Sequence, residues 1–337
     1  MKEKSVYLTV SSTKPLLTWF AIVATIFGLC IALFFHEASI GAVITLAGYV
    51  LSMKDFSRFT GPLQILTSGS AALGTGVLLD LPLDHVPFYT CAMGVVFLAN
   101  FGRIVFFKIF AYTGKTWIEP TLIVVALALH LSGNILGYSN WATWFVPLPA
   151  FFFAVLIAWG IYKDKKQLSS HTLKGYKVAI GAYAPPFALP DQDGNIVQLS
   201  DFIGKRHLLL IFVRGDWCPG CHMMLRTYQR EKEKFASKNV FVMSIGPDPV
   251  GVNREMVERL GLDFSVLADE KQRTAMTYGV QLEEYDNQFA EQYEEGIPLP
   301  ASFLIDKQGV VRYISRPDKV GEFLNPSLIF PIVEQLD

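Results

Sequence analysis

Two cysteines separated by two residues are the side chains of this sequence best suited to chemistry. They lie in the run Gly215-Asp216-Trp217-Cys218-Pro219-Gly220-Cys221-His222. A thiol in the first turn of a helix lies near unpaired backbone N–H groups and the positive end of the helix dipole, and both stabilise a thiolate. The thiolate is the nucleophile in disulfide exchange and in attack on peroxides. The spacing therefore predicts a redox pair that cycles between a dithiol and a short-range disulfide.

A strand and a helix are expected to position this pair. The apolar run 207–213 has the pattern of a buried central strand. After Cys221, apolar residues recur at helical spacing as far as Phe235, which predicts a helix that opens at the cysteines. Half of a zinc site is the alternative for a CxxC motif, but no second CxxC and no suitably spaced histidine pair follows. We therefore expect no metal ion, and no other cofactor.

The chain as a whole is more apolar than a soluble protein of this size. Of the 337 residues, 51% are hydrophobic, and the mean hydropathy is +0.34. Part of the chain is therefore expected to lie in a lipid bilayer. The net charge of −1 gives no indication of nucleic-acid binding. Nearly uncharged blocks long enough to form about six membrane spans cover residues 15–35, 38–53, 62–79, 86–102, 117–137 and 141–162.

The basic residues between these blocks predict the orientation of the chain. Lys and Arg occur in the amino-terminal tail and at 54–58, 103–115 and 163–166, whereas the alternate loops contain neither. The positive-inside rule then places the amino terminus and the segment after residue 162 on the cytoplasmic side. A count of five spans would instead place that segment on the outer or periplasmic side.

The composition changes after the last block. We expect residues 1–162 to form a multi-span membrane domain, 163–178 a polar linker, and 179–337 one compact domain. In that domain, segments with strand patterns alternate with segments with helix patterns, and the chain closes with a hairpin and a helix. The predicted fold is a helical membrane bundle followed by an α/β thioredoxin-like domain. The acidic excursion 281–295 is expected to be a solvated insertion, with a docking surface as the alternative.

Two segments of the second domain, the opening 181–205 and the run 214–221 around the cysteines, resemble motifs of the alkyl hydroperoxide reductase/thiol-specific antioxidant family of peroxiredoxin-like redoxins. A third segment, Pro300-Ala301-Ser302-Phe303-Leu304-Ile305-Asp306, resembles the one that carries a cis-proline in thioredoxin-fold proteins. The resemblance covers residues 180–320 and does not extend to the membrane half. It implies a thiol-dependent oxidoreductase that reduces a disulfide-bearing protein or a hydroperoxide. Its electron donor would be a thioredoxin-like protein or a small thiol.

The resemblance leaves two assignments of the thiols open. In thioredoxin-like members, Cys218 would be the exposed attacking thiolate and Cys221 the resolving thiol. In peroxiredoxin-like members, Cys221 would be the peroxidatic thiol. The activating arginine of peroxiredoxins is replaced here by Pro300 or Ala301, and the buried acid of thioredoxins by Phe212. We favour Cys218 as the nucleophile, because it precedes Cys221 by one helical turn and so lies nearer to the unpaired N–H groups at the start of the helix.

Several neighbours are expected to support the cysteines. Trp217 is predicted to cover the thiol, Pro219 belongs to the matching run, and Pro300 resembles the cis-proline that faces a CxxC in thioredoxin folds. We expect His222 to be solvated, with proton transfer as the alternative. Positive charge near the thiolate is expected from one of three arginines: Arg214, Arg312 or Arg316.

The membrane half allows other functions. Cys30 and Cys91 are expected to be small apolar residues in lipid-buried helices, but an intramembrane thiol pair that passes electrons is the alternative. His130 lies at a similar depth, where an ionisable residue is a functional candidate. An electron conduit or transporter with a regulatory redoxin domain therefore competes with the enzyme. A non-catalytic binding module is a further alternative, because a fold does not establish a function.

Overall fold

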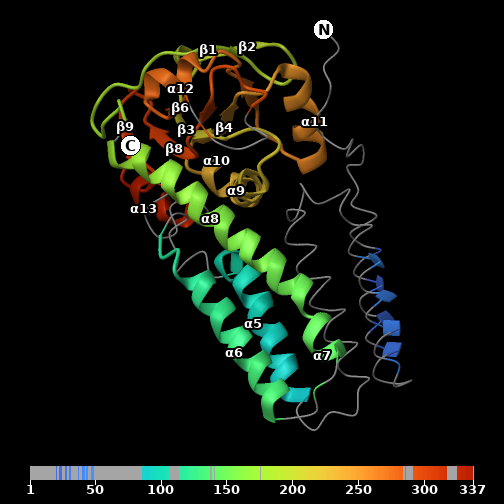
Figure 1. Cartoon of the computed structure of the whole chain (residues 1–337). Coiled ribbons are helices and arrows are strands. Elements are labelled where there is room, and N and C mark those ends of the chain that lie inside the picture. The colour runs from blue at the N-terminus through green and yellow to red at the C-terminus, as the bar shows by residue number, and fades with distance from the viewer. Residues whose placement is uncertain are drawn as a thin grey trace. The chain divides into compact units, whose positions relative to one another are not determined.

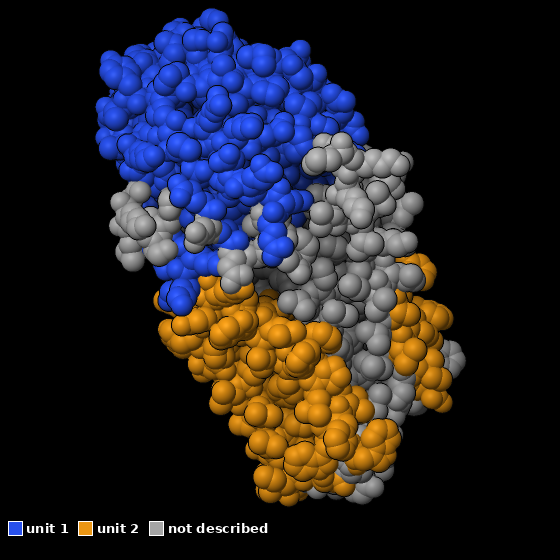
Figure 2. Space-filling model, turned by 45° about the horizontal axis from the view of Figure 1, so that its top comes forward, with its two compact units in different colours: residues 1–13, 107–114, 165–337 blue, residues 14–106, 115–164 orange. Residues whose placement is uncertain are grey.

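The computed structural model describes residues 86–105, 114–136, 139, 141–174, 176–283, 285, 291–316 and 325–336, together with isolated positions between 20 and 48. Two compact units divide the chain (Figure 2). One contains residues 165–337 with the short segments 1–13 and 107–114, and the other contains 14–106 and 115–164. The domain boundaries expected from the sequence stay a prediction.

Apolar helices make up the described part of the second unit. Their bounds are α5 Val86–Val105, α6 Ile118–Leu136, α7 Trp141–Phe145 and α8 Leu148–Lys174, the last of which continues into the other unit (Figure 1). Helices α5 and α6 pack closely at Gly133 of α6, where an added Cβ atom would lie only 3.1 Å from the ring of Tyr89 in α5. Small residues of α5, α6 and α8 fill much of the core between these helices, among them Ala92, Ala126, Ala150 and Ala154.

Two stretches of the described residues are long and apolar enough to cross a membrane, Ile118–Leu136 and Thr143–Ser169. The expected span 86–102 is helical as α5, while the expected spans 15–35, 38–53 and 62–79 lie largely outside the described residues. The expected span 141–162 is interrupted between α7 and α8 at Pro147, whose ring nitrogen cannot donate a helical hydrogen bond. The expected linker is helical from residue 163 to Lys174.

The cysteine-bearing unit is built on a five-stranded sheet in the order β5-β4-β3-β8-β9. Strands β3, β4 and β5 run parallel, and β8 and β9 run antiparallel to their neighbours. Every residue of β3 is buried, as expected for a central strand flanked on both sides. This mixed sheet with helical crossovers has the predicted thioredoxin-like topology. The strands are β3 His207–Phe212, β4 Val240–Gly246, β5 Val266–Ala268, β8 Ala301–Ile305 and β9 Val311–Ile314.

The helices and smaller strands follow the expected order with shifted ends. The expected helix up to Phe235 is divided at Glu231 into α9 Pro219–Arg230 and α10 Lys232–Ala236. The hairpin around the turn at residues 191–194 pairs β1 Ala188–Pro190 with β2 Ile196–Gln198. The remaining elements are η2 Leu199–Asp201, α11 Val250–Leu260, α12 Arg273–Tyr278, β6 Gln281–Leu282, β7 Ile297–Pro298, η3 Pro326–Leu328 and α13 Phe330–Val333.

The topology brings polar residues from separate loops to one edge of the sheet. The carboxyl ends of parallel strands meet at the same edge. The loop that follows β3 carries Asp216 and Cys218, and the loop that follows β4 carries Asp248. The antiparallel pair of β6 and β7 frames the acidic excursion and returns the chain to β8.

Candidate functional site

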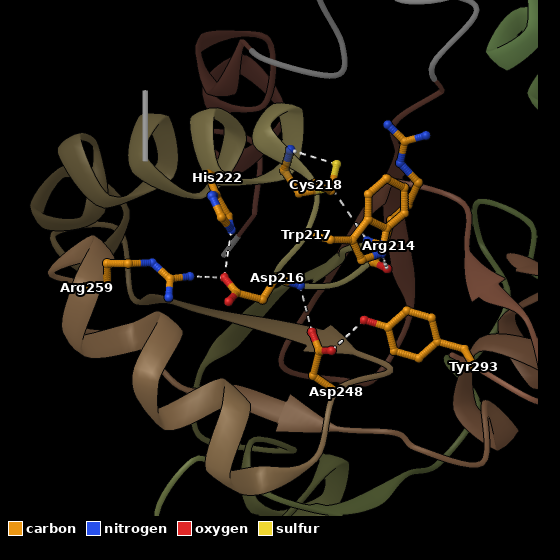
Figure 3. Close-up of polar contacts among 9 residues, drawn as sticks. Arg214, Asp216, Trp217, Cys218, His222, Asp248, Arg259 and Tyr293 are labelled. Atoms are coloured by element: carbon orange, nitrogen blue, oxygen red, sulfur yellow. Dashed lines mark hydrogen bonds and ion pairs between the residues drawn. The ribbon is translucent and has the colours of Figure 1, made fainter. Parts of the chain in front are cut away.

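Cys218 is the N-cap residue of α9. Its backbone is extended, with φ −91° and ψ 102°, and Pro219 occupies the first helical turn, where its missing N–H costs nothing. The backbone N–H of Cys221 donates to Sγ of Cys218 over 3.2 Å (Figure 3). The sulfur therefore takes the place of the side-chain oxygen that usually caps a helix, which favours its charged form.

The two thiols have opposite acidities. Burial alone would raise the pKa of Cys218, but hydrogen bonding from Cys221 and the charge of Arg214 outweigh it and lower the pKa to about 6. Burial raises the pKa of Cys221 well above the ordinary thiol value, and its bond with Cys218 and the charge of that thiolate raise it further. At neutral pH the reduced pair therefore consists of a thiolate at Cys218 and a thiol at Cys221.

Both sulfurs are buried, so the expectation of an exposed Cys218 was wrong. Each cysteine is 0% exposed. The backbone N–H of Arg214 reaches Sγ of Cys221 over 3.5 Å, so the loop before the cysteines folds against them. Trp217 is itself buried and belongs to the same apolar core.

Arg214 is held by two aromatic rings. Its guanidinium lies 5.4 Å from the ring centroid of Trp217 and 5.7 Å from that of Tyr285. Its Nη1 donates to the phenol oxygen of Tyr285 over 2.7 Å, and the Trp217 indole N–H donates to the Arg214 carbonyl over 3.0 Å. Of the three arginines considered from the sequence, Arg214 is the one whose charge lowers the pKa of Cys218. Arg312 instead pairs with Asp306 over 2.6 Å.

A buried charged cluster lies beside the cysteines. Asp216 accepts from Nε2 of His222 over 2.8 Å and forms an ion pair with Arg259 from α11 (Figure 3). Burial opposes the ionised form of Asp216, but these two partners outweigh it and lower its pKa. The expectation of a solvated His222 was wrong, because its side chain is 0% exposed and turned toward Asp216.

A second carboxyl group, Asp248, supports the loop from below in the view of Figure 3. One oxygen accepts from the backbone N–H of Asp216 over 2.7 Å, and the other accepts from the phenol of Tyr293 over 2.5 Å. Burial raises the pKa of Asp248 to about 7, and the negative charge of Asp216 adds to this shift. Gly215 allows the approach of the phenol, because its φ is +121° and a Cβ there would lie 2.5 Å from the Tyr293 oxygen.

The excursion 281–295 is only partly solvated. Its described acidic residues, Glu283, Glu291, Glu294 and Glu295, are exposed as expected. Tyr285 and Tyr293 instead pack against the core and bond to Arg214 and Asp248. The simple description of a solvated insertion was therefore wrong for its tyrosines.

Pro300 is buried directly before β8. Because Ala301 pairs with Phe212 across the sheet, Pro300 lies beside the point where β3 leads into the cysteine loop. The expectation of a cis bond was wrong, since no described peptide bond is cis. The trans form is the default even before proline, and no feature of the sequence alone reverses that preference. The roles of Pro300 and Pro219 stay predictions.

Sequence reasoning missed most of the polar partners of this site: Asp216, Asp248, Arg259, Tyr285 and Tyr293. A signal for two of them was available, because Asp216 and Asp248 each follow a parallel strand and so reach the same edge of the sheet. Nothing in the sequence signalled the three partners from other elements.

The candidate residues of the amino-terminal half are Cys30, Cys91 and His130, and a thiol pair between the two cysteines stays a prediction. Cys30 and Cys91 are free, half-buried and exposed respectively. His130 is buried next to Asn134, whose Nδ2 lies 3.3 Å from its Nε2, and its ring contacts those of Tyr89 and Phe151. Among the residues that the structure describes, no group of three or more His, Cys, Asp or Glu side chains is arranged to hold a metal ion.

The part of the chain that contains this site is similar to known proteins. The family model described as AhpC/TSA matches residues 180–314. The peroxiredoxin Q of rice chloroplasts (Oryza sativa subsp. japonica) is 32% identical over 153 residues, which is 44% of this chain. That match spans 66% of the relative, slightly less than two thirds of its length.

A second kind of relative matches the same region. The thiol-disulfide oxidoreductase ResA of Bacillus thuringiensis is 32% identical over 139 residues, which cover 41% of this chain and 70% of the relative. Among solved structures, the peroxidoxin BcpB of Mycobacterium tuberculosis superposes with a TM-score of 0.42 at 19% identity, over 48% of this chain and 99% of that one.

Proposed function

Since the carboxy-terminal domain of this chain belongs to the AhpC/TSA family, we propose that the protein is a membrane-anchored thiol-disulfide oxidoreductase whose Cys218 and Cys221 cycle between dithiol and disulfide. The observation that carries this proposal is the asymmetry of the two thiols. Cys218 accepts the N–H of Cys221, and its pKa is lowered to about 6, while burial raises the pKa of Cys221. Such a pair suits an attacking thiolate followed by a resolving thiol.

With a disulfide substrate, the Cys218 thiolate attacks one substrate sulfur. A mixed disulfide forms, and the other substrate sulfur leaves as a thiolate. Cys221 then gives up its proton and attacks Sγ of Cys218, which forms the Cys218–Cys221 disulfide and releases the second substrate thiolate. Two electrons have passed to the substrate, and the proton of Cys221 goes to a leaving thiolate. A thioredoxin-like protein or two small thiols then reduce the pair again.

A hydroperoxide would enter at the same sulfur. The Cys218 thiolate attacks the peroxide oxygen, becomes a sulfenic acid, and releases an alkoxide that takes up a proton. Cys221 then displaces water from the sulfenic acid to form the same disulfide. The similarity to peroxiredoxin Q proteins favours this second substrate class. Cys221 as the peroxidatic thiol is the less favoured alternative, because burial and the neighbouring thiolate raise its pKa.

Oxidation of the purified full-length chain in detergent tests the proposal. One equivalent of either a small disulfide reagent or hydrogen peroxide should oxidise the pair to a Cys218–Cys221 disulfide. The domain should stay folded, because the two residues already share a hydrogen bond. Alkylation of the remaining thiols, followed by peptide mass spectrometry, detects the link. Two cysteines that stay reduced and unchanged by either oxidant would contradict the redox assignment.

The anchor is proposed to be the helical unit, with about six spans. Large apolar side chains on its helices face outward, as lipid-facing residues do, among them Val124 at 65% exposure, Phe152 at 60% and Trp159 at 63%. The distribution of Lys and Arg in the loops favours the cytoplasmic side for the redox domain.

A reporter fused after Asp337 tests this orientation. A reporter that functions only in the cytoplasm should be active, and an impermeant reagent should fail to label a cysteine added at that end in intact cells. The same cysteine in broken cells serves as the control. Labelling in intact cells would contradict both the orientation and the even number of spans.

A further inference from the structure

We infer that His222 is a positioning residue of the redox site: held by Asp216, it places a positive charge that supports the thiolate form of Cys218. This role rests on the proposed function, in which Cys218 is the attacking sulfur, and it concerns how the same site responds to pH. His222 lies directly after the CxxC motif and takes no part in the exchange steps described above.

His222 lies in the first turn of α9, beside the nucleophile. Its backbone N–H donates to the carbonyl of Cys218 over 3.1 Å, which is the first helical hydrogen bond after the cap. Its side chain is 0% exposed, so solvent screens its charge only weakly. Burial raises the pKa of Cys218, and the charge of His222 is among the contributions that lower it, although it is smaller than that of Arg214.

Asp216 holds the imidazole in place. Its Oδ1 accepts from Nε2 of His222 over 2.8 Å, and the same oxygen forms the ion pair with Arg259 of α11 (Figure 3). Burial raises the pKa of Asp216, but its two cationic partners outweigh burial and keep it ionised. An ionised carboxylate has no proton to donate, so the hydrogen of this bond belongs to Nε2. The ring therefore has a fixed position and a negatively charged partner.

A second carboxyl group lies near the imidazole without competing for it at acid pH. Burial raises the pKa of Asp248 to about 7, so this group is mostly neutral at pH 6. Asp216 is then the carboxylate that balances the charge of His222. The ionisable and charged groups that face His222 or its carboxylate partner come from three elements: Cys218 of α9, Asp216 and Asp248 of the loops after β3 and β4, and Arg259 of α11.

Alkylation of Cys218 by iodoacetamide in the full-length His222→Gln protein, in detergent, tests the inference. A glutamine amide can donate to Asp216 as Nε2 does, but it carries no charge at any pH. Since one of several charges is lost, we expect alkylation about two- to threefold slower than in the wild type at pH 6. At pH 9.5, where Cys218 is a thiolate in both proteins, the rates should agree. Peptide mass spectrometry assigns the label to Cys218.

His207→Gln is the matched control. His207 is also buried, but it begins β3, at the opposite end of that strand from the cysteine loop. Its Nδ1 accepts from the backbone N–H of Lys307 over 3.2 Å. The pH profile of Cys218 alkylation should be unchanged in this variant.

The Asp216→Asn background tests whether His222 acts through its carboxylate partner. In that protein the charge of Arg259 is no longer balanced, which disfavours a second positive charge at His222. The effect of His222→Gln should therefore disappear, so that the double variant and Asp216→Asn are alkylated at the same rate at pH 6. An equal effect of His222→Gln in both backgrounds would contradict the role of Asp216.

A folded His222→Gln protein with the wild-type rate at pH 6 would overturn the inference. Equal slowing at pH 6 and pH 9.5 would also overturn it, because a packing defect, unlike a lost charge, acts at every pH. His222→Asn removes the same charge and reports in the same way if the glutamine variant fails to fold. A wild-type Cys218 whose alkylation does not accelerate as the pH rises through about 6 would instead refute the proposed function.

Discussion

Replacement of Cys218 by serine is expected to reduce turnover of a disulfide substrate to the uncatalysed background, a fall of roughly a thousandfold or more. A serine hydroxyl at the cap of α9 keeps the hydrogen bond from the Cys221 N–H but is not ionised at neutral pH. Cys221→Ser should also stop turnover, but only after the first attack. That variant should accumulate a mixed disulfide through Cys218, which gel electrophoresis without reductant and mass spectrometry both detect.

Cys91→Ser is the matched control for these variants. Cys91 is a free, exposed cysteine of α5, and its loss should leave turnover unchanged. If the amino-terminal half were an electron conduit, turnover would instead fall in this variant. A mixed disulfide through Cys221 in the Cys218→Ser protein would reverse the assignment of the two thiols.

Arg214→Gln is expected to shift the pH dependence of the reaction. The reactive form of Cys218 is the thiolate, so reactivity is present above its pKa and is lost as the pH falls through about 6. Without the guanidinium the pKa of Cys218 should rise toward the ordinary thiol value, while the hydrogen bond from Cys221 still lowers it. A more basic thiolate is intrinsically more nucleophilic, which offsets part of the loss. The net result should be alkylation of Cys218 that is about severalfold slower at pH 6 and no slower at pH 9.5.

Iodoacetamide alkylation of Cys218 across this pH range measures the effect. Arg312→Gln is the control, because it removes the same charge from an exposed position where the guanidinium pairs with Asp306 over 2.6 Å. Its profile should match that of the wild type. If Arg214→Gln leaves the midpoint near pH 6 in a folded protein, the charge of Arg214 is not what acidifies the thiol.

The strands and helices of the redox domain could be predicted because their patterns are local. The buried run of β3, the buried run of β8 and the turn before β2 each follow from residues adjacent in the sequence. The sequence also contains a signal for the division of the last predicted span, because Pro147 lies between the end of α7 and the start of α8. The break at Glu231 between α9 and α10 had no such signal.

The chemistry of the site could be predicted only in part, because only some of its contacts join residues that are close in the sequence. The position of Cys218 at a helix start and the presence of Arg214 nearby are local, and both bear on the acidity of the thiol. The burial of that thiol and the partners of Asp216 and Asp248 depend on contacts across the fold. Arg259 reaches Asp216 from α11, and Tyr293 reaches Asp248 from beyond α12. A single sequence carries no pattern for such pairs.

We propose that Cys218, and not Cys221, provides the sulfur that attacks the substrate. The most direct measurement exposes the full-length Cys218→Ser and Cys221→Ser proteins to hydrogen peroxide and maps sulfenic acid with a dimedone-type probe. Rapid labelling of Cys218 is expected in the Cys221→Ser protein, and no comparable labelling of Cys221 is expected in the Cys218→Ser protein. Rapid, stoichiometric labelling of Cys221 in the Cys218→Ser protein would contradict it.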